Sequence, residues 1–239
     1  MQEQNSFKKG IADGMPICFG YLSVSFAFGI FAMNQGVFKW FHAVIMSLTN
    51  LTSAGQLAAV PIIALGGSLL ELATAQFIIN LRYALMSVSL SQKLSSSVRF
   101  IERFIISFAI TDEIYAVAVS NKLPVGTRYM LGLATMPILG WTSGTFLGAV
   151  AGNFLTQTVV VSLGVAIYGM FVAIVLPVAK AHKQTLYCVI LAISLSLIFN
   201  FTPFLKGIGD GFIIIICAVL ASAVFAILKP IEIKEEENE

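Results

Sequence analysis

Three charged residues lie inside apolar stretches of the sequence, where charge is costly. Arg82 lies in Ser68–Leu90, and the adjacent acids Asp112 and Glu113 lie in Ile101–Ser120. A charge at the centre of a bilayer costs ~3 kcal/mol or more, so such residues face a partner or water and often mark a transport pathway. Adjacent helical positions point about 100° apart, so one acid can pair with Arg82. The other acid can then bind a substrate ammonium group or carry a proton; a purely structural ion pair is the alternative.

A polar interruption, Thr49–Gln56, divides another apolar stretch, Phe38–Leu65. It offers hydroxyl groups, backbone amides and the Gln56 side chain at membrane depth. A half-helix that begins near Gly55 would direct its positive end toward an anion such as a carboxylate. A short loop at the membrane surface between two shorter helices is the alternative.

The composition predicts the elements that must position these residues. Of 239 residues, 58% are hydrophobic and 11% charged, whereas soluble domains carry about a quarter charged residues. We therefore expect an all-α integral membrane protein, a single transmembrane domain over residues 1–239 with a charged, solvated tail at 229–239. About eight segments approach the ~20 residues that a crossing needs: Met15–Met33, Phe38–Leu65, Ser68–Leu90, Ile101–Ser120, Tyr129–Ala151, Val159–Ala179, Leu186–Asn200 and Gly207–Leu228.

The distribution of basic residues leaves two topologies open. If every segment crosses once, an inside N-terminus receives more lysine and arginine, but Lys93, Arg99 and Arg103 fall outside. If Phe38–Leu65 and Ile101–Ser120 are instead re-entrant or broken helices, that basic loop becomes cytoplasmic. Irregular backbone at membrane depth is tolerated only where protein or a water-filled cavity covers it.

An internal similarity suggests two structural repeats. The stretch that starts at Pro16 and continues through Gly20-Tyr21 resembles the stretch that starts at Pro137 and continues through Gly140-Trp141. The offset is about 120 residues, and transporters are often built from such halves with the site near their interface. The candidate halves are residues 11–120 and 126–228; chance similarity between glycine-rich spans is the alternative. Glycines spaced by four, as at Gly140, Gly144 and Gly148, also permit close helix packing.

Other kinds of chemistry find little support. Cys18, Cys188 and Cys217 lie singly in apolar stretches, which argues against a disulfide framework or a metal site. No helix presents two histidines with a glutamate, as a zinc protease would. Asp112 is the only central aspartate, which disfavours a paired-aspartate protease. We expect no cofactor, no metal and no enzymatic activity.

Several short motifs resemble the AzlC family, the large subunits of bacterial branched-chain amino acid exporters. They are Asn80-Leu81-Arg82-Tyr83, Thr111-Asp112-Glu113, Ser53-Ala54-Gly55-Gln56 and Gly140-Trp141, and the likeness continues to Leu228. The resemblance implies export of branched-chain amino acids, and in some members of methionine. It also implies a small membrane partner of the AzlD type, a multi-pass location in the bacterial inner membrane and coupling to the proton-motive force.

The candidate substrate-binding or proton-coupling residues are Ser53, Gly55, Gln56, Asn80, Arg82, Asp112 and Glu113. Two other functions compete with export. One is a non-transporting membrane scaffold in which the charges only hold the helices together, and the other is a channel. Uphill transport separates an exporter from both.

Overall fold

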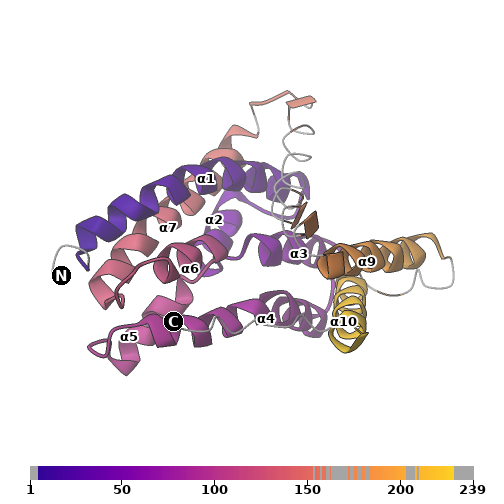
Figure 1. The fold of residues 1–239 in the computed structure, drawn as a ribbon. Helices are drawn as coiled ribbons and strands as arrows, with labels where there is room; N and C mark the ends of the chain where they lie inside the picture. The colour runs from indigo at the N-terminus through magenta and orange to yellow at the C-terminus, as the bar shows by residue number, and fades with distance from the viewer. Residues whose placement is uncertain are drawn as a thin grey trace.

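The computed structural model describes residues 5–152, 154–156, 158–159, 162, 172, 175–176, 179–180, 183–202, 208 and 210–228. The described chain is helical, which confirms the predicted all-α class for these residues (Figure 1). Its helices are α1 (Phe7–Asn34), α2 (Trp40–Thr49), α3 (Ser53–Ala64), α4 (Leu69–Lys93), α5 (Phe100–Phe108), α6 (Asp112–Val119), α7 (Thr127–Ala151), α9 (Lys183–Phe201) and α10 (Asp210–Leu228). The predicted tail 229–239 and most of the predicted segment Val159–Ala179 lie outside the described residues.

Three of these helices, α1, α7 and α9, are long and apolar enough to cross a membrane. Helices α2 and α3 and the part Phe212–Leu228 of α10 are shorter apolar helices. The two predicted segments with polar interruptions are each divided into two helices, α2 with α3 and α5 with α6. Broken helices are therefore present, while the total number of crossings and the two repeats stay predictions.

Helices α1 and α7 run side by side in the same direction (Figure 1). Near their starts, the Tyr129 hydroxyl of α7 donates to Asp13 Oδ2 of α1 at 2.9 Å. Farther along, the Ser25 hydroxyl donates to the Gly140 carbonyl at 3.4 Å. Because residue numbers rise together along both helices, the two helices are parallel. We call the end at which both begin the N-terminal end, and the opposite end the distal end.

Glycines on α7 allow this pair to approach closely. A Cβ atom at any of three positions on α7 would collide with a backbone carbonyl of α1. The contacts are Gly140 with Cys18, Gly144 with Leu22 and Gly148 with Phe26. The predicted role of these glycines in close helix packing is confirmed.

Helix α4 returns toward the N-terminal end. Immediately after it, the Ser95 amide donates to the Val125 carbonyl at 2.9 Å, and the Val125 amide donates to the Lys93 carbonyl at 3.0 Å. The next residue, Gly126, donates its amide to Asn5 Oδ1 at 2.9 Å. The end of α4 therefore lies beside the starts of α1 and α7. Simple crossings of every segment would put Lys93 and Asn5 at opposite ends, so the structure agrees with the re-entrant alternative.

Helices α5 and α6 form a hairpin that enters from the N-terminal end. In the first turn of α5, Glu102 Oε2 accepts from the Thr127 hydroxyl at the start of α7, at 2.9 Å. The break after α5 reaches the middle of α1, where Thr111 Oγ1 lies 2.7 Å from the Tyr21 hydroxyl. Helix α6 then returns, and a side chain just beyond it bonds to Tyr129 in the first turn of α7. The hairpin thus begins and ends at the same end of the molecule.

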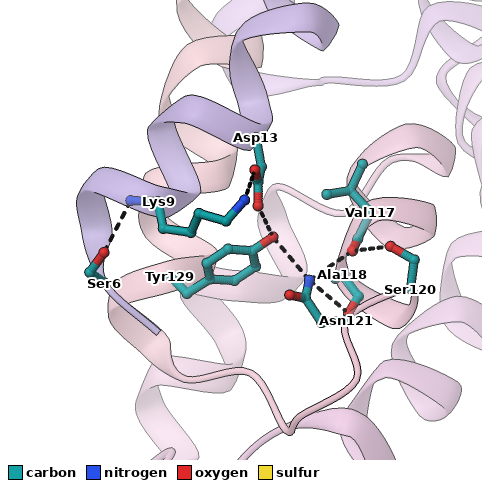
Figure 2. Close-up of polar contacts among 8 residues, drawn as sticks. All are labelled: Ser6, Lys9, Asp13, Val117, Ala118, Ser120, Asn121 and Tyr129. Atoms are coloured by element: carbon teal, nitrogen blue, oxygen red, sulfur yellow. Dashed lines mark hydrogen bonds and ion pairs between the residues drawn. The ribbon is translucent and has the colours of Figure 1, made fainter. Parts of the chain in front are cut away.

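A polar cluster fixes the returning end of this hairpin (Figure 2). Asn121 Nδ2 donates to Tyr129 Oη at 3.0 Å and to the Val117 carbonyl at 2.9 Å. The Tyr129 hydroxyl in turn donates a hydrogen bond to Asp13, which also forms an ion pair with Lys9. Buried polar groups are stable only with partners, and here one chain of bonds joins α1, α6 and α7.

Helices α2 and α3 form a second hairpin, which enters from the distal end. Trp40 is the first residue of α2, and the centre of its ring lies 5.7 Å from the centre of the Phe146 ring near the end of α7. At the start of α3, Gln56 bonds to Trp141 in the middle of α7. Helix α3 then runs back to a turn at Gly66, whose φ of +72° favours glycine, before α4 begins. The tips of the two hairpins therefore approach each other midway along α1, α4 and α7.

Candidate functional site

A cavity of about 620 Å³ lies between the two hairpin tips. Helices α1, α3, α4, α6 and α7 all contribute to its wall. Its polar lining comprises Tyr21, Ser53, Arg82, Tyr83, Thr111, Asp112, Glu113 and Trp141. The rest of the described lining is apolar or glycine: Pro16, Ile17, Gly20, Val24, Leu51, Ala54, Ile79 and Val175. Four of the predicted site residues line this cavity, namely Ser53, Arg82, Asp112 and Glu113.

Each hairpin tip is stabilised by a threonine cap at the start of its second helix. Thr52 Oγ1 accepts from the Gly55 amide, and Thr111 Oγ1 accepts from the Ile114 amide, both at 3.3 Å. Threonine at this position satisfies a backbone donor that the first helical turn leaves unpaired. The two breaks in the sequence therefore produce two helix N-termini at the cavity.

The two N-termini differ in charge. The first turn of α6 contains Asp112 and Glu113, whereas the first turn of α3 contains no acid. A helix N-terminus carries the positive end of the helix dipole and favours a negative charge. The acids of α6 supply that charge themselves, while the N-terminus of α3 at Ser53 has no acidic side chain of its own.

Arg82 and Asp112 form the ion pair that was predicted for Arg82 and one of the two acids. Arg82 Nη1 contacts Asp112 Oδ2, while Arg82 Nη2 donates to the Tyr83 hydroxyl at 3.1 Å. The guanidinium carbon also lies 4.8 Å from the centre of the Tyr83 ring, a cation–π distance. The side chains of Arg82 and Asp112 are 39% and 36% exposed, so the pair opens onto the cavity. Arg82 is thereby fixed between α4 and α6.

Glu113 faces a different partner. Its Oε2 accepts from the Tyr21 hydroxyl of α1 at 2.5 Å, and that hydroxyl also lies 2.7 Å from Thr111 Oγ1. Because a hydroxyl carries one proton, Thr111 can donate to Tyr21 while Tyr21 donates to Glu113. Among the described residues no lysine, arginine or histidine forms an ion pair with Glu113.

Gln56 lies behind the cavity wall rather than in it. Its side chain is fully buried; Oε1 accepts from Trp141 Nε1 at 2.8 Å, and Nε2 donates to Ser47 Oγ at 3.2 Å. Ser47 in turn bonds to Thr145 of α7 at 2.7 Å. The amide thus fixes the tip of the α2–α3 hairpin to α7 and orients Trp141, whose ring belongs to the cavity wall.

Gly55 and Asn80 also support the wall without lining the cavity. The Gly55 carbonyl accepts from Gln76 Nε2 of α4 at 2.8 Å, and Gln76 Oε1 accepts from Asn80 Nδ2 at 3.2 Å. Asn80 Oδ1 is buried and has no hydrogen-bond partner in the described structure. These bonds connect the start of α3 to α4.

Sequence reasoning did not select Tyr21, although a signal was present. Tyr21 and Trp141 occupy matching positions in the internal similarity, and the centres of their rings lie 5.3 Å apart in an edge-on contact at the cavity.

The described residues contain no cluster of three or more His, Cys, Asp or Glu side chains suited to a metal ion.

Comparison with known proteins identifies the family. Residues 16–155 match the AzlC protein family. The chain belongs to the AzlC family. The matched part of the AzlC chain contains every candidate site residue and ends just beyond α7.

Two relatives of this AzlC protein are membrane proteins by name. An uncharacterized membrane protein of Archaeoglobus fulgidus is 33% identical over 178 residues, covering 74% of this chain and 77% of the relative. The inner membrane protein YgaZ of Escherichia coli K12 is 29% identical over 195 residues, covering 79% and 78%. No solved structure matches the chain. The family and these relatives indicate a membrane protein with a role related to transport.

Proposed function

We propose that this AzlC-family protein exports branched-chain amino acids and binds them in the cavity between the two hairpin tips. The observation that carries the proposal is that two parts of the wall of one cavity favour opposite charges. Glu113 offers a carboxylate without a cationic partner in the described structure, and the N-terminus of α3 at Ser53 offers positive backbone dipoles. An α-amino acid carries the two matching charges, an ammonium group and a carboxylate.

Each end of the substrate then has a physical counterpart. The substrate carboxylate accepts from backbone amides at the start of α3, because a helix N-terminus is an anion site. The substrate ammonium group faces Glu113, the acid that Arg82 does not neutralise. Branched aliphatic side chains, and that of methionine, fit the apolar part of the wall, which includes Val24 and Ile79.

The proposed orientation follows from basic residues. Those placed at the N-terminal end of the bundle are Lys8, Lys9, Lys93, Arg99, Arg103, Lys122 and Arg128. Cytoplasmic ends of membrane proteins carry an excess of lysine and arginine. We therefore place the N-terminal end in the cytoplasm, with the α5–α6 hairpin re-entrant from the cytoplasm and the α2–α3 hairpin from the outside.

The remaining parts of the proposal rest on the family. The protein works in the bacterial inner membrane, together with an AzlD-type small membrane subunit, and draws energy from the proton-motive force. Its relative YgaZ is an inner membrane protein, which supports this location. The two hairpins that meet halfway along the longer helices suit alternating access to a fixed central site.

The experiment is leucine efflux from bacterial cells that lack their own exporters. Cells that express the protein with the AzlD-type subunit should lower internal leucine below the external concentration, against the leucine gradient, and a protonophore should abolish this. Cells that express either subunit alone provide the control. Leucine movement only down its gradient would indicate a channel, and no movement at all would support a scaffold.

A further inference from the structure

The described lining of the cavity has an unbalanced charge. It contains two acids, Asp112 and Glu113, and one base, Arg82. The Arg82–Asp112 ion pair cancels two of these charges, so an ionised Glu113 leaves the empty cavity with one net negative charge. Glu113 is exposed toward the cavity. A charge at membrane depth without a counter-ion is unfavourable, so Glu113 favours the binding of one positive charge.

The surroundings of Glu113 decide what can supply that charge. The charged or titratable groups lining the same cavity are Tyr21 from α1, Arg82 and Tyr83 from α4, and Asp112 from α6. The contributions of α3 and α7 to this lining, among them Ser53 and Trp141, carry no titratable group. Arg82 is occupied by Asp112 and Tyr83. Within the described residues no fixed cation remains for Glu113, and a mobile species can supply the charge.

We propose that the Glu113 carboxylate is one exchange site shared in turn by a proton and by the ammonium group of the substrate. This inference rests on the proposed function and supplies the coupling step of that function. In the proposed cycle a proton occupies Glu113 while the cavity is empty of substrate. When leucine enters, the O–H bond of the carboxyl group breaks, the proton leaves to water on the open side, and the ammonium group takes its place. No covalent bond to the substrate forms.

Sharing of the Glu113 carboxylate produces an exchange of protons for leucine without a second ion-binding site. The proton and the ammonium group cannot be bound together, because the carboxylate offers one compensating negative charge. A proton that enters from outside displaces leucine, and leucine that enters from the cytoplasm displaces a proton. Glu113 is neutralised in both states, by the proton or by the ammonium group, while the N-terminus of α3 stabilises the carboxylate of bound leucine. The protein can therefore change its access from one side to the other in both states, but not when Glu113 is ionised and unpaired.

Tyr21 serves as the positioning residue for both states. Its hydroxyl lies 2.5 Å from Glu113 Oε2 and donates to the carboxylate in the leucine-bound state. When Glu113 carries the proton, the hydroxyl can accept from the carboxyl group instead, since a phenol both donates and accepts. Replacing Tyr21 by phenylalanine should keep the exchange but change the pH at which it occurs.

The test is leucine binding to the purified two-subunit complex between pH 4.5 and pH 8. In the wild type the apparent Kd for leucine should rise as the pH falls, approaching about tenfold per pH unit, because protons compete for the site. Each leucine bound at low pH should also release close to one proton, measured with a pH indicator in weak buffer. Glu113→Gln should bind leucine more weakly, with a Kd that does not change with pH, and should release no proton.

Glu102→Gln provides the matched control. Glu102 lies at the N-terminal end, outside the cavity lining, where it bonds to the Arg99 amide and Thr127. This variant should keep the pH dependence of the wild type. Leucine binding that neither depends on pH nor releases a proton in the wild type would overturn the inference and leave the proposed function standing. Proton release that persists in Glu113→Gln would also overturn it, and a wild-type complex that binds no leucine at any pH would overturn both.

Discussion

Arg82→Ala should reduce leucine export by more than about tenfold while the protein still reaches the membrane. Arg82 is the only base in the described lining of the cavity and pairs with Asp112. Without it, two adjacent acids remain at membrane depth, and both draw protons or water into the site. The pair is about one-third exposed to the cavity, so solvent screens part of the effect. A loss of ~1.4 kcal/mol in substrate binding nevertheless suffices for a tenfold reduction.

The measurement is efflux of leucine normalised to the amount of protein in the membrane fraction. Normal efflux from Arg82→Ala would contradict the account. The double variant Arg82→Asp with Asp112→Arg separates a site from a structural pair. It restores an ion pair between α4 and α6 but moves the positive charge to α6, next to Glu113. We expect efflux to remain lost in this variant, whereas full recovery would show that the pair only holds the helices together.

Gly148→Ala should destabilise the protein, because the added methyl group would collide with the Phe26 carbonyl of α1. The new carbon would lie 2.7 Å from the carbonyl carbon of Phe26 and 3.0 Å from its Cα. Both contacts are with backbone, so the two helices must separate. Overpacking of this kind typically costs about 1–3 kcal/mol.

Gly20→Ala is the matched control for this prediction. It adds the same methyl group to α1, where no atom lies within 4 Å of the new carbon. Thermal unfolding in detergent, followed by tryptophan fluorescence, should show a clearly lower midpoint for Gly148→Ala and an unchanged or slightly higher one for Gly20→Ala, since alanine favours a helix more than glycine. Equal midpoints would mean that the close approach of α1 and α7 contributes little to stability.

The part of the site that follows from local chemistry could be predicted from the sequence. A charge inside an apolar stretch needs a partner, and this rule correctly paired Arg82 with one of the two acids. Polar residues in a stretch that is too long for one crossing correctly indicated the break between α2 and α3. The positions of Lys93 and Asn5 at one end of the bundle agree with the re-entrant alternative, one of the two topologies that the basic residues left open.

The parts that depend on distant contacts could not be predicted. Gln56 was a candidate for binding substrate, but its amide is occupied by Trp141 and Ser47 and lies behind the cavity wall. A lone glutamine in a sequence does not reveal whether its partners lie in the protein or in a ligand. Tyr21 was not selected for a related reason, since its partner Glu113 lies 92 positions away in the chain. Only the fold brings the hairpin tip to the middle of α1.

The measurement that tests the central claim most directly is protection of the cavity by substrate. Ser53→Cys places a thiol at the start of α3 in the cavity lining, in a background without the three natural cysteines. Leucine at saturating concentration should slow the reaction of this thiol with a small methanethiosulfonate reagent several-fold. Ser97→Cys, in the exposed connection between α4 and α5, should react at the same rate with and without leucine. An unprotected Ser53→Cys in a variant that still exports leucine would contradict the claim that substrate occupies the cavity between the two hairpin tips.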